Sequence, residues 1–176
     1  MVDIIRRRCN PIVDLLKFTS NKKIMKKVVD LYKRFIVELS WAWVGNPCIE
    51  KELDNLIQAQ DHFVLFLAET LTDEARLDCI LYNINFDQKW EVPRYGRGGG
   101  LVLYWKNSIN LTIEDSHRYF FDAIINKNTN EEWRFVRFYG EPDTSRRHEA
   151  WSMLRSLNNW PNTPWICTGD FNKIKQ

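Results

Sequence analysis

Short apolar runs separated by turn residues fill the chain from residue 62 onward, and they constrain the fold more than any other feature. The runs are rich in valine, isoleucine and aromatic residues, which is the composition of β-strands. The strands expected are residues 62–68, a stretch near Trp90, and residues 101–105, 109–113, 119–125, 133–139 and 165–168. Helical spacing of apolar residues predicts helices between some of these runs, so the fold class expected is α+β.

Three helices are expected in this strand-rich body. Pro47 begins the first, Thr72 caps the second, and residues 145–159 form the third. The polar residues 126–130 lie between two strand-like runs and predict a hairpin.

The first segment of the chain has a different character. Residues 22–39 carry apolar residues at helical spacing with lysines opposite, which predicts a basic amphipathic helix. Residues 1–39 hold ten Lys/Arg against four Asp/Glu, whereas the remainder holds fifteen against nineteen. We therefore divide the chain into an appended segment, residues 1–38, and a body, residues 39–176. The helix can touch nucleic acid or an anionic membrane, but docking of its apolar stripe on the core is the interpretation we favour.

Composition indicates one folded, intracellular protein. The chain has 176 residues, 44% of them hydrophobic, with eight tryptophans, which is enough for a core. Its four cysteines are far apart, with no zinc-binding spacing, and free thiols indicate a reducing compartment, nucleus or cytoplasm. No apolar run approaches the length of a membrane span, and the first residues lack a secretory signal, so no membrane partner is expected.

The motif Trp165-Ile166-Cys167-Thr168-Gly169-Asp170-Phe171-Asn172 suggests chemistry. In extended backbone, Asp170 and Asn172 project to the same side at the end of a strand. A carboxylate beside a carboxamide can orient and deprotonate a water or bind a hard cation. The alternative is a simple Gly-Asp turn.

Other segments accompany this motif in a fixed order: Leu65–Thr70, Gly96–Lys106, Trp133–Pro142 and Arg146–Trp151. In order and spacing, the set resembles the endonuclease/exonuclease/phosphatase superfamily, and in particular the endonuclease region of plant non-LTR (LINE-type) retrotransposons. The resemblance runs from about Leu39 to Asn172. It implies a hydrolase that cleaves DNA phosphodiesters, and a chain that forms an incomplete half of a four-layer α/β sandwich.

The resemblance also implies roles for four residues. Glu69 resembles the metal-binding carboxylate, and Tyr139 the tyrosine that contacts the scissile phosphate. Asp170 resembles the aspartate that activates the attacking water near the metal, with Asn172 as its orienting partner. An all-oxygen donor set suits Mg²⁺ or Mn²⁺. We expect these side chains to converge at one edge of a sheet, and no small-molecule cofactor is expected.

Four arginines are candidate contacts for the nucleic-acid backbone: Arg94, Arg97, Arg146 and Arg147. Arg94 precedes the glycine-rich segment 96–100, and Arg97 lies within it. This segment matches neither a Walker loop nor a dinucleotide fingerprint, and is interpreted as a permissive turn.

Two departures from the family pattern bear on activity. Ala42 stands where the plant elements usually carry an asparagine, and we expect the back half of the family's domain, with its second sheet, a further catalytic aspartate and an Asp-His pair, to be absent. We assign none of the three histidines a catalytic role. The function expected is therefore that of an inactive remnant of a metal-dependent DNA endonuclease. The alternative is a nucleic-acid-binding module without catalysis.

Overall fold

The computed structural model describes residues 62–94, 99–157 and 163–171, the backbone of residues 16–17 and 36–40, and the single residues Lys26, Asp30, Asn55 and Ile57. The chain forms two compact units. One comprises residues 29–110, and the other combines residues 1–28 with residues 111–176. Each unit contains one sheet, and each is described by itself below.

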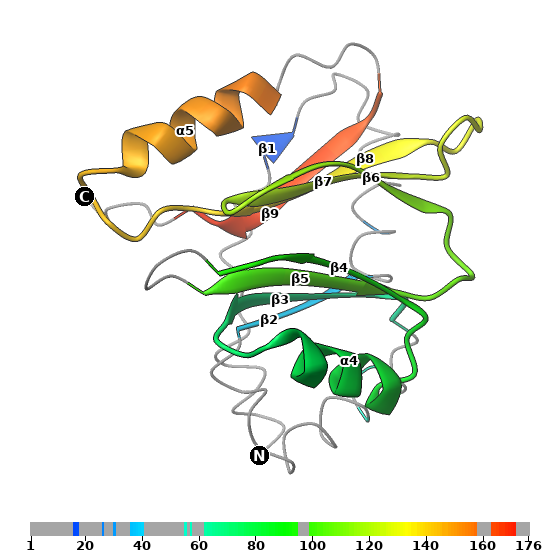
Figure 1. The fold of residues 1–176 in the computed structure, drawn as a ribbon. Coiled ribbons are helices and arrows are strands. Elements are labelled where there is room, and N and C mark those ends of the chain that lie inside the picture. The colour runs from blue at the N-terminus through cyan, green and yellow to red at the C-terminus, as the bar shows by residue number, and fades with distance from the viewer. Residues whose placement is uncertain are drawn as a thin grey trace. The chain divides into compact units, whose positions relative to one another are not determined.

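The unit of residues 29–110 has a four-stranded sheet in the order β2-β3-β5-β4 (Figure 1). Its strands are β2 (Ile36–Ser40), β3 (Val64–Thr70), β4 (Gln88–Val92) and β5 (Gly100–Trp105). Strand β3 pairs parallel with β2 and antiparallel with β5. All residues of β3 except Glu69 are buried, which explains why this run is apolar throughout rather than alternating.

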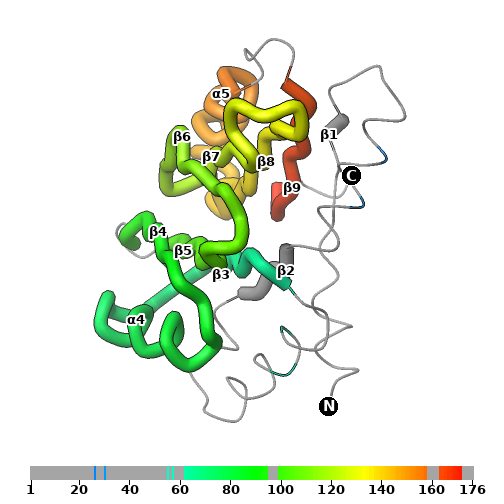
Figure 2. The backbone as a smooth tube through the Cα atoms, turned by 90° about the vertical axis from the view of Figure 1, so that its right-hand side faces the viewer, coloured from blue at the N-terminus to red at the C-terminus, as the bar shows by residue number. Residues whose placement is uncertain are grey.

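Helix α4 (Glu74–Asn83) packs on one face of this sheet through Leu77 and Ile80 (Figures 1 and 2). Leu65 and Leu67 of β3 meet the helix because alternate strand residues share a face. The Tyr104 hydroxyl donates to the Leu77 carbonyl oxygen at 3.0 Å. Burial raises the pKa of Tyr104, so this phenol keeps its proton and remains a donor.

The other unit has a five-stranded sheet in the order β1-β9-β8-β7-β6. Its strands are β1 (Leu16–Lys17), β6 (Leu111–His117), β7 (Phe120–Ile125), β8 (Trp133–Tyr139) and β9 (Trp165–Asp170). Strands β6, β7 and β8 are antiparallel neighbours, whereas β8 and β9 run parallel. The parallel pair is joined through helix α5 (Arg147–Ser156), since parallel strands need a long crossover connection.

Helix α5 covers one face of the five-stranded sheet (Figure 1). Its Ala150 and Leu154 pack with Val136, Phe138 and Cys167, among other residues. A buried ion pair lies in the same unit. Arg134 donates from Nε and Nη2 to the two carboxylate oxygens of Asp122, at 2.7 and 2.6 Å. Its Nη1 donates to the Leu157 carbonyl oxygen at 2.7 Å, so the pair ties the sheet to the end of α5.

The α+β class and most elements expected from the sequence are confirmed. Residues 133–139 form β8 with the bounds expected, and the hairpin around residues 126–130 joins β7 to β8. The N-cap of α4 is Asp73 rather than Thr72, because the Asp73 carboxylate accepts from the Arg76 backbone N–H at 2.9 Å. The expectation that the second sheet is absent is wrong, since the chain forms two.

The expected helix over residues 22–39 is wrong at its end. Lys26 and Asp30 are helical, but Ile36–Ser40 form strand β2 and pair with β3. The division of the chain at residues 38 and 39 stays a prediction. Strand β1 lies before that boundary and pairs with β9, whereas β2 crosses the boundary and pairs with β3. No helix in the part of the chain that the structure describes has the length and hydropathy needed to cross a membrane.

Candidate active site

Tyr139 and Asp170 are direct partners at the ends of β8 and β9. The two strands are parallel, so their carboxyl ends lie at the same edge of the five-stranded sheet. The Gly140 backbone N–H donates to the Asp170 carbonyl oxygen at 2.7 Å, which continues the pairing one residue past β8. Asp170 is exposed and Tyr139 half-buried, so both side chains are accessible at this edge.

Two glycines allow this close pairing. Gly169 has a φ of 155°, and a Cβ placed on it would lie 1.7 Å from the Phe138 carbonyl oxygen. A Cβ on Gly140 would lie 2.8 Å from the Phe171 carbonyl oxygen. Any side chain at either position would push the strands apart, because backbone atoms cannot yield as a flexible side chain does. The Gly-Asp sequence is therefore more than a turn signal: its glycine sets the position of Asp170.

Arg137 and Thr168 also pair with each other, two residues before Tyr139 and Asp170, so all four residues lie on the same face of the sheet. Val136, Phe138 and Cys167 pack against α5, so the alternating residues Arg137, Tyr139, Thr168 and Asp170 project from the opposite face. Arg137 is only 6% exposed, and its Nη1 donates to the Phe138 carbonyl oxygen at 3.1 Å. Sequence reasoning missed this residue, although an arginine inside an apolar strand is a signal that could have found it.

Glu69 has an unusual backbone conformation. It lies at a β-bulge between Ala68 and Thr70 with a φ of 60°, in the left-handed region that non-glycine residues seldom adopt. Its side chain is exposed, in a strand whose other residues are buried. Gly99 explains how the backbone is accommodated, since a Cβ there would lie 2.2 Å from the Glu69 Cα. Bulges and strained residues concentrate at functional sites, where they redirect a side chain.

The four residues implied by the resemblance therefore have different outcomes. Tyr139 and Asp170 lie together. Glu69 lies in the four-stranded sheet, so the expectation that all four share one edge of one sheet is wrong. Asn172 lies outside the described residues. Among the residues that the structure describes, no three His, Cys, Asp or Glu side chains gather closely enough to hold a metal ion.

Three of the four candidate arginines are described. Arg94 follows β4 and is exposed, whereas Arg97 lies outside the described residues. Arg146 pairs with Glu149 at 3.7 Å. Arg147 donates to the carbonyl oxygens of Glu141 and Pro142, at 3.3 and 3.0 Å, so it stabilises the loop between β8 and α5.

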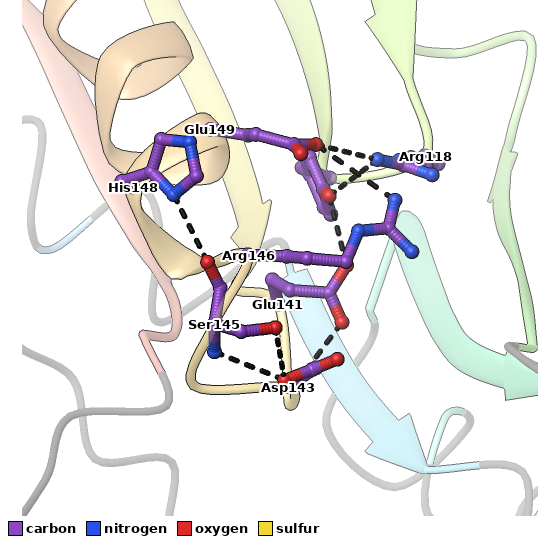
Figure 3. A network of polar contacts seen from close by, with 8 residues as sticks. Arg118, Glu141, Asp143, Ser145, Arg146, His148 and Glu149 are labelled. Atoms are coloured by element: carbon purple, nitrogen blue, oxygen red, sulfur yellow. Dashed lines mark hydrogen bonds and ion pairs between the residues drawn. The ribbon is translucent and has the colours of Figure 1, made fainter.

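This loop, residues 140–146, follows Tyr139 and is held by a dense polar network (Figure 3). The Asp143 carboxylate accepts from the Ser145 backbone N–H and hydroxyl, at 2.9 and 2.8 Å, and these bonds lower the pKa of Asp143. His148 contacts the Ser145 carbonyl oxygen at 3.1 Å. These short-range contacts order the segment that links the strand end to the helix.

The sequence matches the model of the Endonuclease/Exonuclease/phosphatase family over residues 49–174. The fold and the strand-end pair of Tyr139 and Asp170 thus lie within a recognised hydrolase architecture, and the chain belongs to this family. A sequence search of the curated proteins finds no match.

Solved structures share the fold at low sequence identity. The endonuclease domain of TRAS1, a telomere-specific non-LTR retrotransposon, has a TM-score of 0.55 at 12% identity, with 80% of this chain and 59% of that chain covered. D. rerio TDP2 complexed with single strand DNA product gives 0.57 at 13%, with 80% and 61% covered. The human Nocturnin catalytic domain with bound sulfate anion gives 0.51 at 13%, with 71% and 56% covered. The chain therefore spans less than two thirds of each of these structures.

Enzymes of this family generally use divalent metal ions. The exposed carboxylates of Glu69 and Asp170 are hard oxygen donors, which fits Mg²⁺ or Mn²⁺ in kind. The described cysteines do not offer a competing soft site, since Cys167 is buried and Cys79 is alone on the surface of α4.

Proposed function

We propose that this chain carries the phosphate-binding and water-activating part of a divalent-metal-dependent DNA endonuclease site. The observation that carries the proposal is the register pairing of Tyr139 with Asp170 at the carboxyl ends of β8 and β9, in a chain of this family. A phenol and a carboxylate side by side offer a donor for a phosphate oxygen and an acceptor for the proton of a water.

Each residue has a defined task in this proposal. The Tyr139 hydroxyl donates to a non-bridging phosphate oxygen, where negative charge grows during hydrolysis. The Asp170 carboxylate accepts a proton from the attacking water, and Asn172 orients that water through its amide. The Glu69 carboxylate is a metal ligand, and the bulge that exposes it leaves its oxygens accessible. When bound, the metal supplies Lewis-acid polarisation of the phosphate.

Whether these 176 residues cleave DNA by themselves is a separate part of the proposal. We propose that the rate at which they cleave DNA does not exceed background. Ala42 stands at the position of a polar residue in the resembling elements, and about two fifths of the TRAS1 domain has no counterpart here. Catalytic groups that act as a unit leave little activity when the set is incomplete.

The first prediction tests this function through binding and cleavage together. The chain should bind an unmodified DNA duplex more tightly with Mg²⁺ than with EDTA, and Asp170→Asn should abolish the difference. Tyr139→Phe should weaken binding about three- to tenfold, the usual worth of one hydrogen bond. Supercoiled plasmid should stay intact with Mg²⁺.

Glu131→Gln is the matched control, since Glu131 lies in an exposed loop. Affinity that is indifferent to Mg²⁺ in every variant contradicts the site assignment. Nicking that disappears in Asp170→Ala contradicts the proposed inactivity and keeps the assignment.

The second candidate is a nucleic-acid-binding module without catalysis. The exposure of Arg94 favours it, because an exposed guanidinium can contact backbone phosphates. Arg97, Arg146 and Arg147 complete the proposed set. Binding that falls steeply with salt, does not respond to EDTA and weakens in Arg94→Gln would support this candidate. We propose that the protein acts inside the cell, in the nucleus or cytoplasm, on the ground of its widely spaced cysteines.

A further inference from the structure

Tyr119, in the turn between β6 and β7, contacts both Tyr139 and Glu141. The Tyr139 backbone N–H donates to the Tyr119 carbonyl oxygen at 2.6 Å. The Tyr119 hydroxyl donates to the Glu141 carboxylate at 2.8 Å. Because Tyr139 and Glu141 are two residues apart, one residue of the turn holds both ends of the tripeptide that contains Gly140.

Arg118 links this two-point contact to helix α5. Its Nη2 donates to the Tyr119 hydroxyl oxygen at 2.6 Å and to the Glu149 carboxylate at 3.0 Å (Figure 3). Its guanidinium also lies over the Tyr119 ring, 4.6 Å from the centroid. Glu149 lies in the first turn of α5, so the turn, the loop after Tyr139 and the helix form one connected set of contacts.

The chemistry of Tyr119 suits a permanent contact. The residue is 3% exposed, and burial together with the hydrogen bond to Glu141 raises the pKa of its phenol. The hydroxyl therefore stays protonated at neutral pH and donates to a carboxylate, which makes a stronger bond than a neutral acceptor would. Gly140, which bonds to the Asp170 carbonyl oxygen, lies between the two residues that Tyr119 contacts.

We propose that Tyr119 is a positioning residue for Tyr139: its carbonyl oxygen holds the Tyr139 backbone and its hydroxyl holds the Glu141 side chain, so that the Tyr139 phenol meets a DNA phosphate in one orientation. The inference rests on the proposed function for the role of Tyr139. Its geometric part stands on the contacts of Tyr119 alone. Tyr119 acts through Tyr139 and touches no substrate itself.

The test compares the full-length chain with Tyr119→Phe, which keeps the ring and removes the hydroxyl. Tyr104→Phe is the matched control, because it removes a buried tyrosine hydroxyl bond in the other unit. Glu141→Gln is the conservative variant, since its amide oxygen can still accept from Tyr119. Two quantities are measured: amide hydrogen exchange of residues 139–146, and Mg²⁺-dependent affinity for the unmodified DNA duplex.

In Tyr119→Phe we expect exchange in residues 139–146 to rise about three- to tenfold and affinity to fall by a similar factor, as expected for one lost hydrogen bond. Glu141→Gln should lie between this variant and the original chain, and Tyr104→Phe should match the original in both measurements. Circular dichroism verifies that each variant is folded.

Two results would overturn the inference while leaving the proposed function intact. Unchanged exchange in Tyr119→Phe would show that the contact does not hold the segment. Faster exchange with unchanged Mg²⁺-dependent affinity would show that the contact supports the fold alone. If the original chain shows no Mg²⁺-dependent affinity, the proposed function fails and the positioning role fails with it, whereas the exchange data still decide whether Tyr119 fixes the loop.

Discussion

Glu69 shows how one residue can trade stability for accessibility. Among the described residues, the other non-glycine positions with positive φ are Asn85, Asn126 and Asn128, and asparagine tolerates that region well. A glutamate does not, and such a conformation costs about 1–2 kcal/mol. The bulge therefore exposes a carboxylate at an energetic cost, which agrees with a role outside stability.

The second prediction follows from this strain. Glu69→Gly should raise the free energy of unfolding by about 0.5–1.5 kcal/mol, because glycine adopts positive φ without a steric penalty. Urea unfolding at neutral pH measures the change. Glu131→Gly, at a position without positive φ, should destabilise slightly and serves as the control. A Glu69→Gly variant less stable than the original chain would contradict the strain.

The third prediction concerns the buried pair of Arg134 and Asp122, whose side chains are 1% and 2% exposed. Asp122→Ala should destabilise the protein by about 3–5 kcal/mol, since it leaves a buried guanidinium without its counter-charge. Lys127→Met removes the more exposed pair of Lys127 with Glu114 and should cost no more than about 1 kcal/mol. Equal losses in the two variants, measured by urea unfolding, would contradict a special role for the buried pair.

The fourth prediction concerns pH and His117. Burial and the nearby Arg118 lower the pKa of His117 below its ordinary value of 6.5. The unfolded chain then binds a proton more readily than the folded one, so stability is full above pH 6.5 and falls as the pH drops below it. His117→Gln should remove this part of the acid sensitivity in unfolding curves taken at pH 5.5 and 7.5. An unchanged slope between these values would contradict the assignment.

At the scale of elements, sequence predicted what local pattern determines and missed what tertiary contacts determine. Strand β8 was predicted to the residue because its apolar run and flanking turns agree. Residues 36–39 fit helical spacing equally well, but pairing with β3 makes them β2. Tyr139 and Asp170 lie at strand ends because each is the last residue of its strand, β8 or β9. The positive φ of Glu69 depends on the approach of Gly99, which no local pattern reveals.

The fifth prediction concerns the two N-terminal strands. Strand β1 pairs with β9 and β2 pairs with β3. Deletion of residues 1–40 therefore removes one neighbour of β9 and one neighbour of β3. Unpaired strand edges and the apolar surface beside them favour association. We expect the truncated chain to aggregate and to bind an apolar dye, as measured by light scattering and fluorescence. Deletion of residues 1–15 keeps both strands and should behave like the full chain; a soluble, monomeric 41–176 fragment would contradict the prediction.

At the scale of the whole molecule, the two units differ in how the chain builds them. The four-stranded unit uses one continuous stretch, residues 29–110, whereas the five-stranded unit needs residues 1–28 together with residues 111–176. A continuous unit pays a smaller entropic cost to bring its strands together than one assembled from distant segments.

The pairing of Leu16 with Cys167 has a consequence for synthesis on the ribosome. Leu16 leaves the tunnel long before Cys167 is made, and at about 5–20 residues per second the interval is many seconds. The continuous unit can fold within that time, while the first strand waits without a partner. The five-stranded sheet is thus completed only after β9, the partner of β1, has been translated.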